Sequence, residues 1–130
     1  GILAMHPEAL ILDEATAMLD PQGRQEVLQT VLKLNREQGI TVVWITHFME
    51  EATHAQRVMV MDHGKIAMDG APREIFAQVD RLRELRLDVP PMTQLARLLK
   101  DREIDIKADV LNVEEMVKEV KRLCPSCLKA

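Results

Sequence analysis

Two short apolar runs in the first half of the chain each end in polar, titratable side chains. Residues 9–12 lead directly into Asp13 and Glu14, and residues 41–46 lead into His47. Continuous apolar runs of this length are typical of strands that are buried on both faces. Each strand must end where the charges begin, because an unpaired buried carboxylate is very costly to desolvate. The pattern therefore predicts two strands of a parallel sheet, with the polar side chains at its carboxyl edge.

A helix is expected between these two strands. Asp20 and Pro21 are a helix-start signal, since Asp caps free N–H groups and Pro suits the first helical position. Apolar residues follow at helical spacing, and Gly39 should end the helix after about Gln38. A strand, a helix and a strand in this order predict a right-handed βαβ unit. The residues before Pro7 read as the last turns of an apolar helix, because a residue that precedes proline avoids helical backbone.

The middle of the chain predicts a hairpin that is followed by helices. Residues 57–62 and 65–70 are strand-like, and the short turn His63-Gly64 between them favours antiparallel pairing. We expect short helices over residues 48–55 and from residue 71 onward, the latter with Ile75 and Phe76 facing inward.

Charged and apolar positions alternate at helical spacing in the last part of the chain. The charged residues 81–86 are expected to form a solvated helical face. Asn112 and Glu115 are predicted to form a capping box that opens a final helix. The side chains expected to pack against the rest of the protein are Leu95, Leu98 and Leu99 in residues 92–100, and Met116, Val117, Val120 and Leu123 in the last helix.

Composition narrows the class of protein. The chain has 130 residues, of which 47% are apolar but only three are Trp or Phe, so we expect one ordered domain with an aliphatic, methionine-rich core. The net charge is −4, and neither half has the basic excess that a phosphate backbone requires, so nucleic acid is not expected as a partner. No apolar run approaches the ~20 residues that span a bilayer, so we expect a soluble chain that can still dock on a membrane protein.

The chain has two cysteines, Cys124 and Cys127, and both lie near the end of the sequence. A single C-x-x-C without further ligands is a poor zinc site, because structural zinc takes four ligands. We expect reduced thiols, and a redox or metal site is the alternative.

Three segments resemble the ATPase subunits of energy-coupling-factor (ECF) transporters, a group of ABC-type ATPases. Residues 10–21 (LILDEATAMLDP) resemble the Walker B strand, catalytic glutamate and D-loop, and residues 45–52 (ITHFMEEA) resemble the switch-histidine segment. Residues 72–96 (PREIFAQVDRLRELRLDVPPMTQLA) resemble the part that is specific to the ECF group. The resemblance implies an α/β fold: the C-terminal half of the parallel sheet of a P-loop ABC nucleotide-binding domain with flanking helices (residues 1–79), and a small helical extension that dimerises (residues 80–130).

The resemblance also implies roles for four residues. Asp13 would hold Mg²⁺ through a water, and Glu14 would polarise the water that attacks ATP. His47 would contact the γ-phosphate, and Asp20 would communicate across a head-to-tail dimer. The simpler alternatives are that Asp13 and Glu14 only end a strand, that Asp20 is only a helix cap, and that His47 is an ordinary strand-end histidine.

Several features depart from the family pattern. Ala15 stands where the family usually has proline, which should loosen the turn after Glu14. The 130 residues contain no G-x-x-x-x-G-K-[ST] segment, no Ser-Gly-Gly signature and no Q-loop. The chain is therefore expected to begin just after the signature helix of a longer ATPase.

Two functional hypotheses follow. In the first, the chain belongs to an ATP-hydrolysing subunit, with ATP and Mg²⁺ as cofactors, that powers uptake of vitamins or transition-metal ions. Its expected partners are a second ATPase subunit, a transmembrane coupling subunit and a substrate-binding membrane subunit, at the cytoplasmic face of a prokaryotic cell membrane. In the second, the chain alone is a truncated structural or dimerisation module that cannot turn over ATP.

Overall fold

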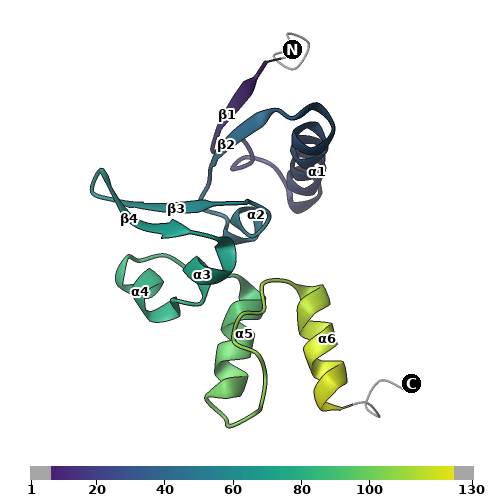
Figure 1. Ribbon diagram of the computed structural model, residues 1–130, viewed down its shortest axis with the longest axis vertical. Helices are drawn as coiled ribbons and strands as arrows, with labels where there is room; N and C mark the ends of the chain where they lie inside the picture. The colour runs from purple at the N-terminus through teal and green to yellow at the C-terminus, as the bar shows by residue number, and fades with distance from the viewer. Residues whose placement is uncertain (1–6, 125–130) are drawn as a thin grey trace. The chain divides into compact units, whose positions relative to one another are not determined.

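The computed structural model describes residues 7–124. The chain divides into two compact units, Gly1–Phe48 and Met49–Ala130. Each unit is described by itself below, with element labels as in Figure 1. The functional division expected between residues 79 and 80 stays a prediction.

The first unit is a βαβ arrangement. Strand β1 (Ala9–Asp13) pairs in parallel with β2 (Thr41–Ile45), and helix α1 (Pro21–Gln38) connects them and packs beside the sheet (Figure 1). Asp20 caps the helix, because its side chain accepts a hydrogen bond from the backbone N–H of Gly23 at 2.9 Å. The strand, helix and parallel strand predicted from the sequence are confirmed.

Gly39 ends α1 as expected. Its φ of 67° is left-handed, and its N–H donates to the carbonyl of Asn35 at 3.1 Å. The side-chain amide of Asn35 donates to the carbonyl of Ile40 at 2.8 Å, which holds the chain as it turns into β2.

The expectation that both faces of these strands are buried is wrong for this chain. Leu10 is buried, but the neighbouring Ile11 is 69% exposed, and Val43 and Ile45 are also exposed. Successive side chains of a strand point to opposite faces. Within the described part of this unit a single helix packs on a sheet of two strands, so one apolar face has no cover.

The second unit begins with α2 (Met49–Ala52) and an antiparallel hairpin of β3 (Val58–Asp62) and β4 (Lys65–Gly70). The turn residues His63 and Gly64 have φ angles of 44° and 75°. Positive φ at both central residues is the geometry that suits a two-residue hairpin, which confirms the predicted turn.

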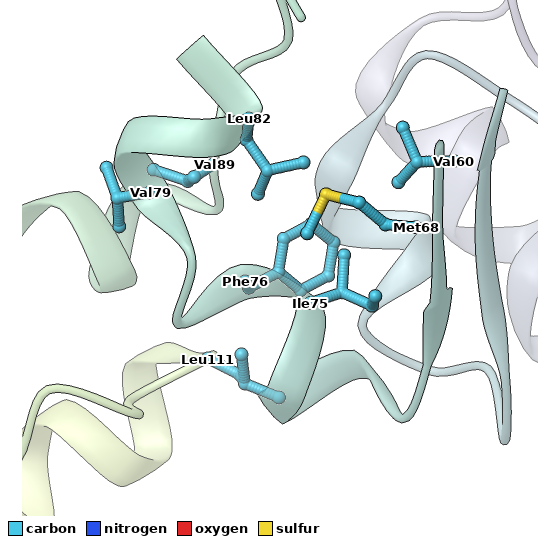
Figure 2. Close-up of a cluster of buried hydrophobic side chains, with 8 residues drawn as sticks. All are labelled: Val60, Met68, Ile75, Phe76, Val79, Leu82, Val89 and Leu111. Carbon is cyan, nitrogen blue, oxygen red and sulfur yellow. The ribbon is translucent and has the colours of Figure 1, made fainter. Parts of the chain in front are cut away.

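Helices α3 (Pro72–Phe76) and α4 (Val79–Glu84) pack against this hairpin. Figure 2 shows the resulting cluster, in which Met68, Ile75 and Phe76 point toward one another. Ile75 and Phe76 face inward as predicted, and the cluster is largely aliphatic; its buried members are Val60, Met68, Ile75, Phe76, Val79, Leu82, Val89 and Leu111. The charged positions of residues 81–86 are exposed as expected, while Leu82 is buried beneath them.

Helix α5 (Pro91–Lys100) confirms the predicted packing only for Leu99, which is partly buried against a small apolar cluster. Thr93 and Ala96 are buried, whereas Leu95 and Leu98 are exposed. The hydroxyl of Thr93 donates to the carbonyl of Val110 at 2.6 Å, and Ala96 lies in a small cluster, so the backbone of the following loop approaches this face closely. The periodicity allowed either face, and this contact selected the one with small side chains.

Helix α6 (Val113–Leu123) is capped by Asn112, which accepts a hydrogen bond from the N–H of Glu115 at 2.9 Å. The prediction that the Glu115 side chain accepts a hydrogen bond from the N–H of Asn112 is wrong. It accepts from the N–H of Leu111, at 3.0 Å. Of the predicted apolar stripe only Met116 is buried, while Val117, Val120 and Leu123 are exposed.

Other sequence expectations fall at the ends of the chain. The apolar helix expected before Pro7 and the residue Cys127 lie outside the described residues. Cys124 is in a disulfide bond, which contradicts the expectation of reduced thiols at this position. Among the described helices, none is both long enough and apolar enough to cross a membrane.

Candidate functional site

The end of β1 places two carboxylates beside the end of β2. Asp13 is in register with Ile45, and the N–H of Glu14 still donates to the carbonyl of Ile45 at 2.9 Å. Glu14 then adopts a left-handed φ of 45°, which is uncommon for a residue other than glycine. The chain therefore turns sharply at Glu14 and leaves the sheet immediately after the acid doublet.

Glu14 and His47 meet at this edge. The Oε1 atom of Glu14 lies 3.3 Å from Nδ1 of His47, and both side chains are a little over half exposed, at 57% and 56%. The contact joins residues that are 33 positions apart in the sequence, because the parallel register aligns the two strand ends. The structure thus brings together the two side chains for which the family resemblance implied catalytic roles.

Asp13 lies directly before Glu14 at the same strand end and is exposed. Among residues 7–124, no group of three or more His, Cys, Asp or Glu side chains could hold a metal ion. This arrangement fits an ion that takes one or two protein carboxylates and completes its coordination with water and phosphate, as Mg²⁺ does. It does not fit a metal that requires a cage made by the protein alone.

Asp20 lies at the start of α1, where its side chain is used as a cap. A Cβ atom at Gly23 would lie 2.9 Å from Oδ1 of Asp20, so glycine allows the close approach that the capping bond requires. The structural alternative for Asp20, a helix cap, is therefore present. A contact across a dimer stays a prediction.

Two further residues of the site carried no prediction from the sequence, Arg24 and Phe48. The ring centroids of His47 and Phe48 are 4.2 Å apart, and the guanidinium carbon of Arg24 lies 4.2 Å from the centroid of the Phe48 ring. Arg24 lies one helical turn after Asp20, just beyond the first motif segment, and Phe48 lies directly after His47 inside the second. An aromatic residue next to a candidate histidine was the available signal.

Known proteins resemble nearly the whole chain. The energy-coupling factor transporter ATP-binding protein EcfA1 of Caldanaerobacter subterraneus is 56% identical over 122 residues, which cover 94% of this chain and 44% of that protein. The protein of the same name from Clostridioides difficile is 54% identical over 123 residues, which cover 95% of this chain and 44% of that protein. The chain thus spans less than half the length of these curated relatives.

A solved structure shares the fold. The structure of cbiO1 from Clostridium perfringens, described as part of the ABC transporter complex cbiONQ, aligns with a TM-score of 0.56 at 34% identity. The alignment covers 79% of this chain and 39% of that one. No protein-family model matches the sequence.

These relatives confirm the resemblance that the motifs indicated, and the structural alignment confirms the fold class. Over more than nine-tenths of its length, the chain is homologous to a segment of the ATP-binding proteins of energy-coupling-factor transporters.

Proposed function

We propose that this chain supplies the residues that activate water and contact the γ-phosphate in the ATP site of an ATP-binding protein of an energy-coupling-factor transporter. The observation that carries the proposal is the 3.3 Å contact between Glu14 and His47 at the ends of two parallel strands. A base and a phosphate-contacting group must lie side by side to act on one nucleotide, and this edge is where open α/β sheets bind ligands.

Glu14 and His47 have complementary tasks in this proposal. As a carboxylate, Glu14 accepts a proton from the attacking water, and its exposure leaves room for that water. His47 contacts the γ-phosphate. A neutral imidazole has one N–H group and an imidazolium has two. If Nδ1 of His47 donates to Glu14, only an imidazolium can also donate a hydrogen bond to the phosphate through Nε2. Phosphoryl transfer depends mostly on positioning and on charge stabilisation, so these two groups can matter greatly.

Asp13 is the proposed Mg²⁺ ligand, through a water. When bound, Mg²⁺ neutralises charge that develops on the phosphate oxygens. Asp13 orients the hydrated ion from the strand end, and Asp20 caps α1 and faces a second ATPase subunit in the proposed head-to-tail dimer.

The 130-residue chain is not expected to hydrolyse ATP by itself. The sequence contains no G-x-x-x-x-G-K-[ST] segment, and the backbone N–H groups and lysine of that segment cradle the phosphates. The second hypothesis, a structural or dimerisation module, is therefore the one we propose for the isolated chain. Binding of Mg-ATP at micromolar concentration by the chain alone would contradict this view.

The relatives' names support a proposal about partners and location. ATP-binding proteins of energy-coupling-factor transporters and a protein of an ABC transporter complex resemble this chain. We propose that the full assembly pairs it with a second ATPase subunit, a transmembrane coupling subunit and a substrate-binding membrane subunit. It would lie at the cytoplasmic face of the membrane and power uptake of vitamins or transition-metal ions.

Residues 80–130 are proposed to form a helical extension that dimerises. The support is the set of apolar side chains that α5 and α6 leave exposed: Leu95, Leu98, Val113, Val117, Val120 and Leu123. Exposed apolar side chains in such number are typical of a protein interface.

A chimeric protein tests the catalytic proposal. In the Caldanaerobacter relative, the matching segment is replaced by this chain, and Mg-ATP hydrolysis is measured for the chimera and its variants. Glu14→Gln and His47→Ala should each lower kcat by roughly a hundredfold or more, since each removes a group that acts on the transferring phosphate. His54→Gln, which changes an exposed histidine outside the site, is the matched control and should leave kcat unchanged. Full activity of the His47→Ala chimera would refute the assignment.

A further inference from the structure

The ring of Phe48 contacts two side chains from different parts of the first unit. Its centroid is 4.2 Å from that of the His47 imidazole, and the two planes are tilted by 37°. The guanidinium carbon of Arg24, near the start of α1, lies over the same ring at 4.2 Å. Arg24 therefore reaches from the helix to the loop that carries His47, with Phe48 as the link.

The surroundings of Arg24 show why the ring contact matters. Its Nε atom is buried and has no hydrogen-bond partner among residues 7–124. A buried donor without a partner is unfavourable, and among the described residues no hydrogen bond from Nε orients this guanidinium. The planar guanidinium is attracted to the face of an aromatic ring and stacks on it, which lysine cannot do in the same way.

The backbone N–H groups of Arg24 and Phe48 both donate local hydrogen bonds. The N–H of Arg24 donates to the carbonyl of Asp20 at 3.0 Å, which places it within the capped first turns of α1. The N–H of Phe48 donates to Oγ1 of Thr46 at 3.0 Å, which holds the turn after β2. The Phe48 ring is therefore a support whose backbone is held at the strand end and whose partner Arg24 is held in the first turns of the helix.

His47 needs such a support. Its imidazole is more than half exposed, and its 3.3 Å contact is with a carboxylate that is equally exposed. An exposed pair of this kind orients its members weakly, because holding two mobile side chains in one geometry costs entropy. The Phe48 ring restricts the imidazole from another direction.

We propose that Arg24 is a positioning residue for His47 and acts through the ring of Phe48. The restraint belongs to the first unit of this chain, while its effect on ATP hydrolysis rests on the function proposed above. The start of α1, which Asp20 caps, is thereby coupled to the orientation of the histidine at the end of β2.

The restraint is tested by nuclear magnetic resonance on the full 130-residue chain. The imidazole proton resonances of His47, identified by their loss in His47→Gln, report the ring current of Phe48. Phe48→Leu should remove this ring-current shift. Arg24→Ala should move the resonances in the same direction by a smaller amount, while Arg36→Ala, which changes an exposed arginine in the last turn of α1, should leave them unchanged.

A second variant separates positioning from folding. Arg24→Lys keeps the charge and the apolar stem but loses the planar guanidinium, so it should retain the fold and still shift the His47 resonances toward those of Phe48→Leu. His47 resonances that stay at their wild-type positions in Arg24→Lys and Arg24→Ala would overturn the proposal. If the chain self-associates, the same spectra are recorded on the chimera.

Kinetics of the chimera test the functional consequence. Arg24→Ala should lower kcat roughly tenfold or more, with little change in KM, because a misplaced group affects the reacting geometry more than substrate binding. In the His47→Ala background, Arg24→Ala should have no further effect. If His47→Ala itself leaves kcat unchanged, the proposed function fails, and the resonance shifts still decide whether Arg24 positions His47.

Discussion

The carboxylate of Glu115, in the first turn of α6, forms a bidentate ion pair with the guanidinium of Arg73 in α3. Nη1 of Arg73 lies 3.2 Å from Oε2 of Glu115, and Nη2 donates to Oε1. Nη1 also donates to the carbonyl of Asp109 at 2.7 Å, and Glu115 accepts from the N–H of Leu111. One charged pair therefore ties α3 to both the loop before α6 and the start of α6.

Removal of this ion pair should destabilise the second unit. We expect Glu115→Gln and Arg73→Ala each to lower the free energy of unfolding by about 1–2 kcal/mol, because the pair is charge-assisted but partly exposed. Denaturant unfolding at pH 7 measures the change. Glu114→Gln, which changes an exposed acid in the same turn of α6, is the control. An equal loss of unfolding free energy in Glu114→Gln and Glu115→Gln would show that the ion pair does not stabilise the fold.

The same pair should make stability depend on acid pH. Hydrogen bonds from Arg73 lower the pKa of Glu115 below its usual value, and the N–H of Leu111 acts in the same direction. A folded-state pKa below the unfolded value of about 4.3 means that the stabilisation is present above that pH and is lost as pH falls through the folded pKa.

We therefore expect the difference in unfolding free energy between wild type and Glu115→Gln to shrink as the pH falls below about 4.3. Lowered pKa values of Asp69, caused by Arg57, and of Glu119, caused by Arg122, have the same sign, but both acids remain in the variant and cancel in the difference. A difference that stays constant down to the acid transition would rule out this linkage.

Two leucines in neighbouring helices offer a matched test of the core. Leu82 in α4 is 1% exposed, and Leu98 in α5 is 53% exposed. Leu82→Ala should cost about 2–5 kcal/mol of unfolding free energy because it leaves a cavity, whereas Leu98→Ala should cost less than about 0.5 kcal/mol. Thermal or urea unfolding of both variants at low protein concentration distinguishes them, and similar losses would place Leu98 in a packed environment.

The side-chain cap of α6 should contribute measurably to the free energy of unfolding. Asn112→Ala removes the acceptor for the N–H of Glu115 and should lower the free energy of unfolding by about 1 kcal/mol. Asn112→Asp keeps an acceptor oxygen at the cap and should recover most of that loss at neutral pH. If the aspartate and alanine variants melt alike, the side-chain cap does not stabilise the helix.

Exposed apolar side chains on α5 and α6 should drive self-association if this extension dimerises. Leu98→Glu and Val117→Glu would place charges in the interface, so each should shift sedimentation velocity profiles toward the monomer. Met59→Glu places the same charge on an exposed apolar position of the hairpin and should not. A wild-type chain that is monomeric at high concentration would contradict the proposed dimerisation.

Local signals in the sequence were sufficient for most element boundaries. Asp20 and Gly39 bound α1 because a capping side chain and a left-handed glycine act within a few residues of the helix end. His63 and Gly64 set the hairpin because a two-residue loop needs positive φ at both positions. The meeting of Glu14 and His47 also followed from the sequence, since parallel strands end at the same edge.

Tertiary packing alone decided which of several compatible faces is buried and which partner each charge takes. Helical spacing in α5 allowed either the leucine face or the face of Thr93 and Ala96, and the loop that accepts the Thr93 hydrogen bond selected the second. Contacts such as that of Arg24 with Phe48 join residues that are far apart in sequence. The periodicity of one segment describes only that segment, whereas the free energy of burial and pairing depends on the neighbour that the fold brings to it.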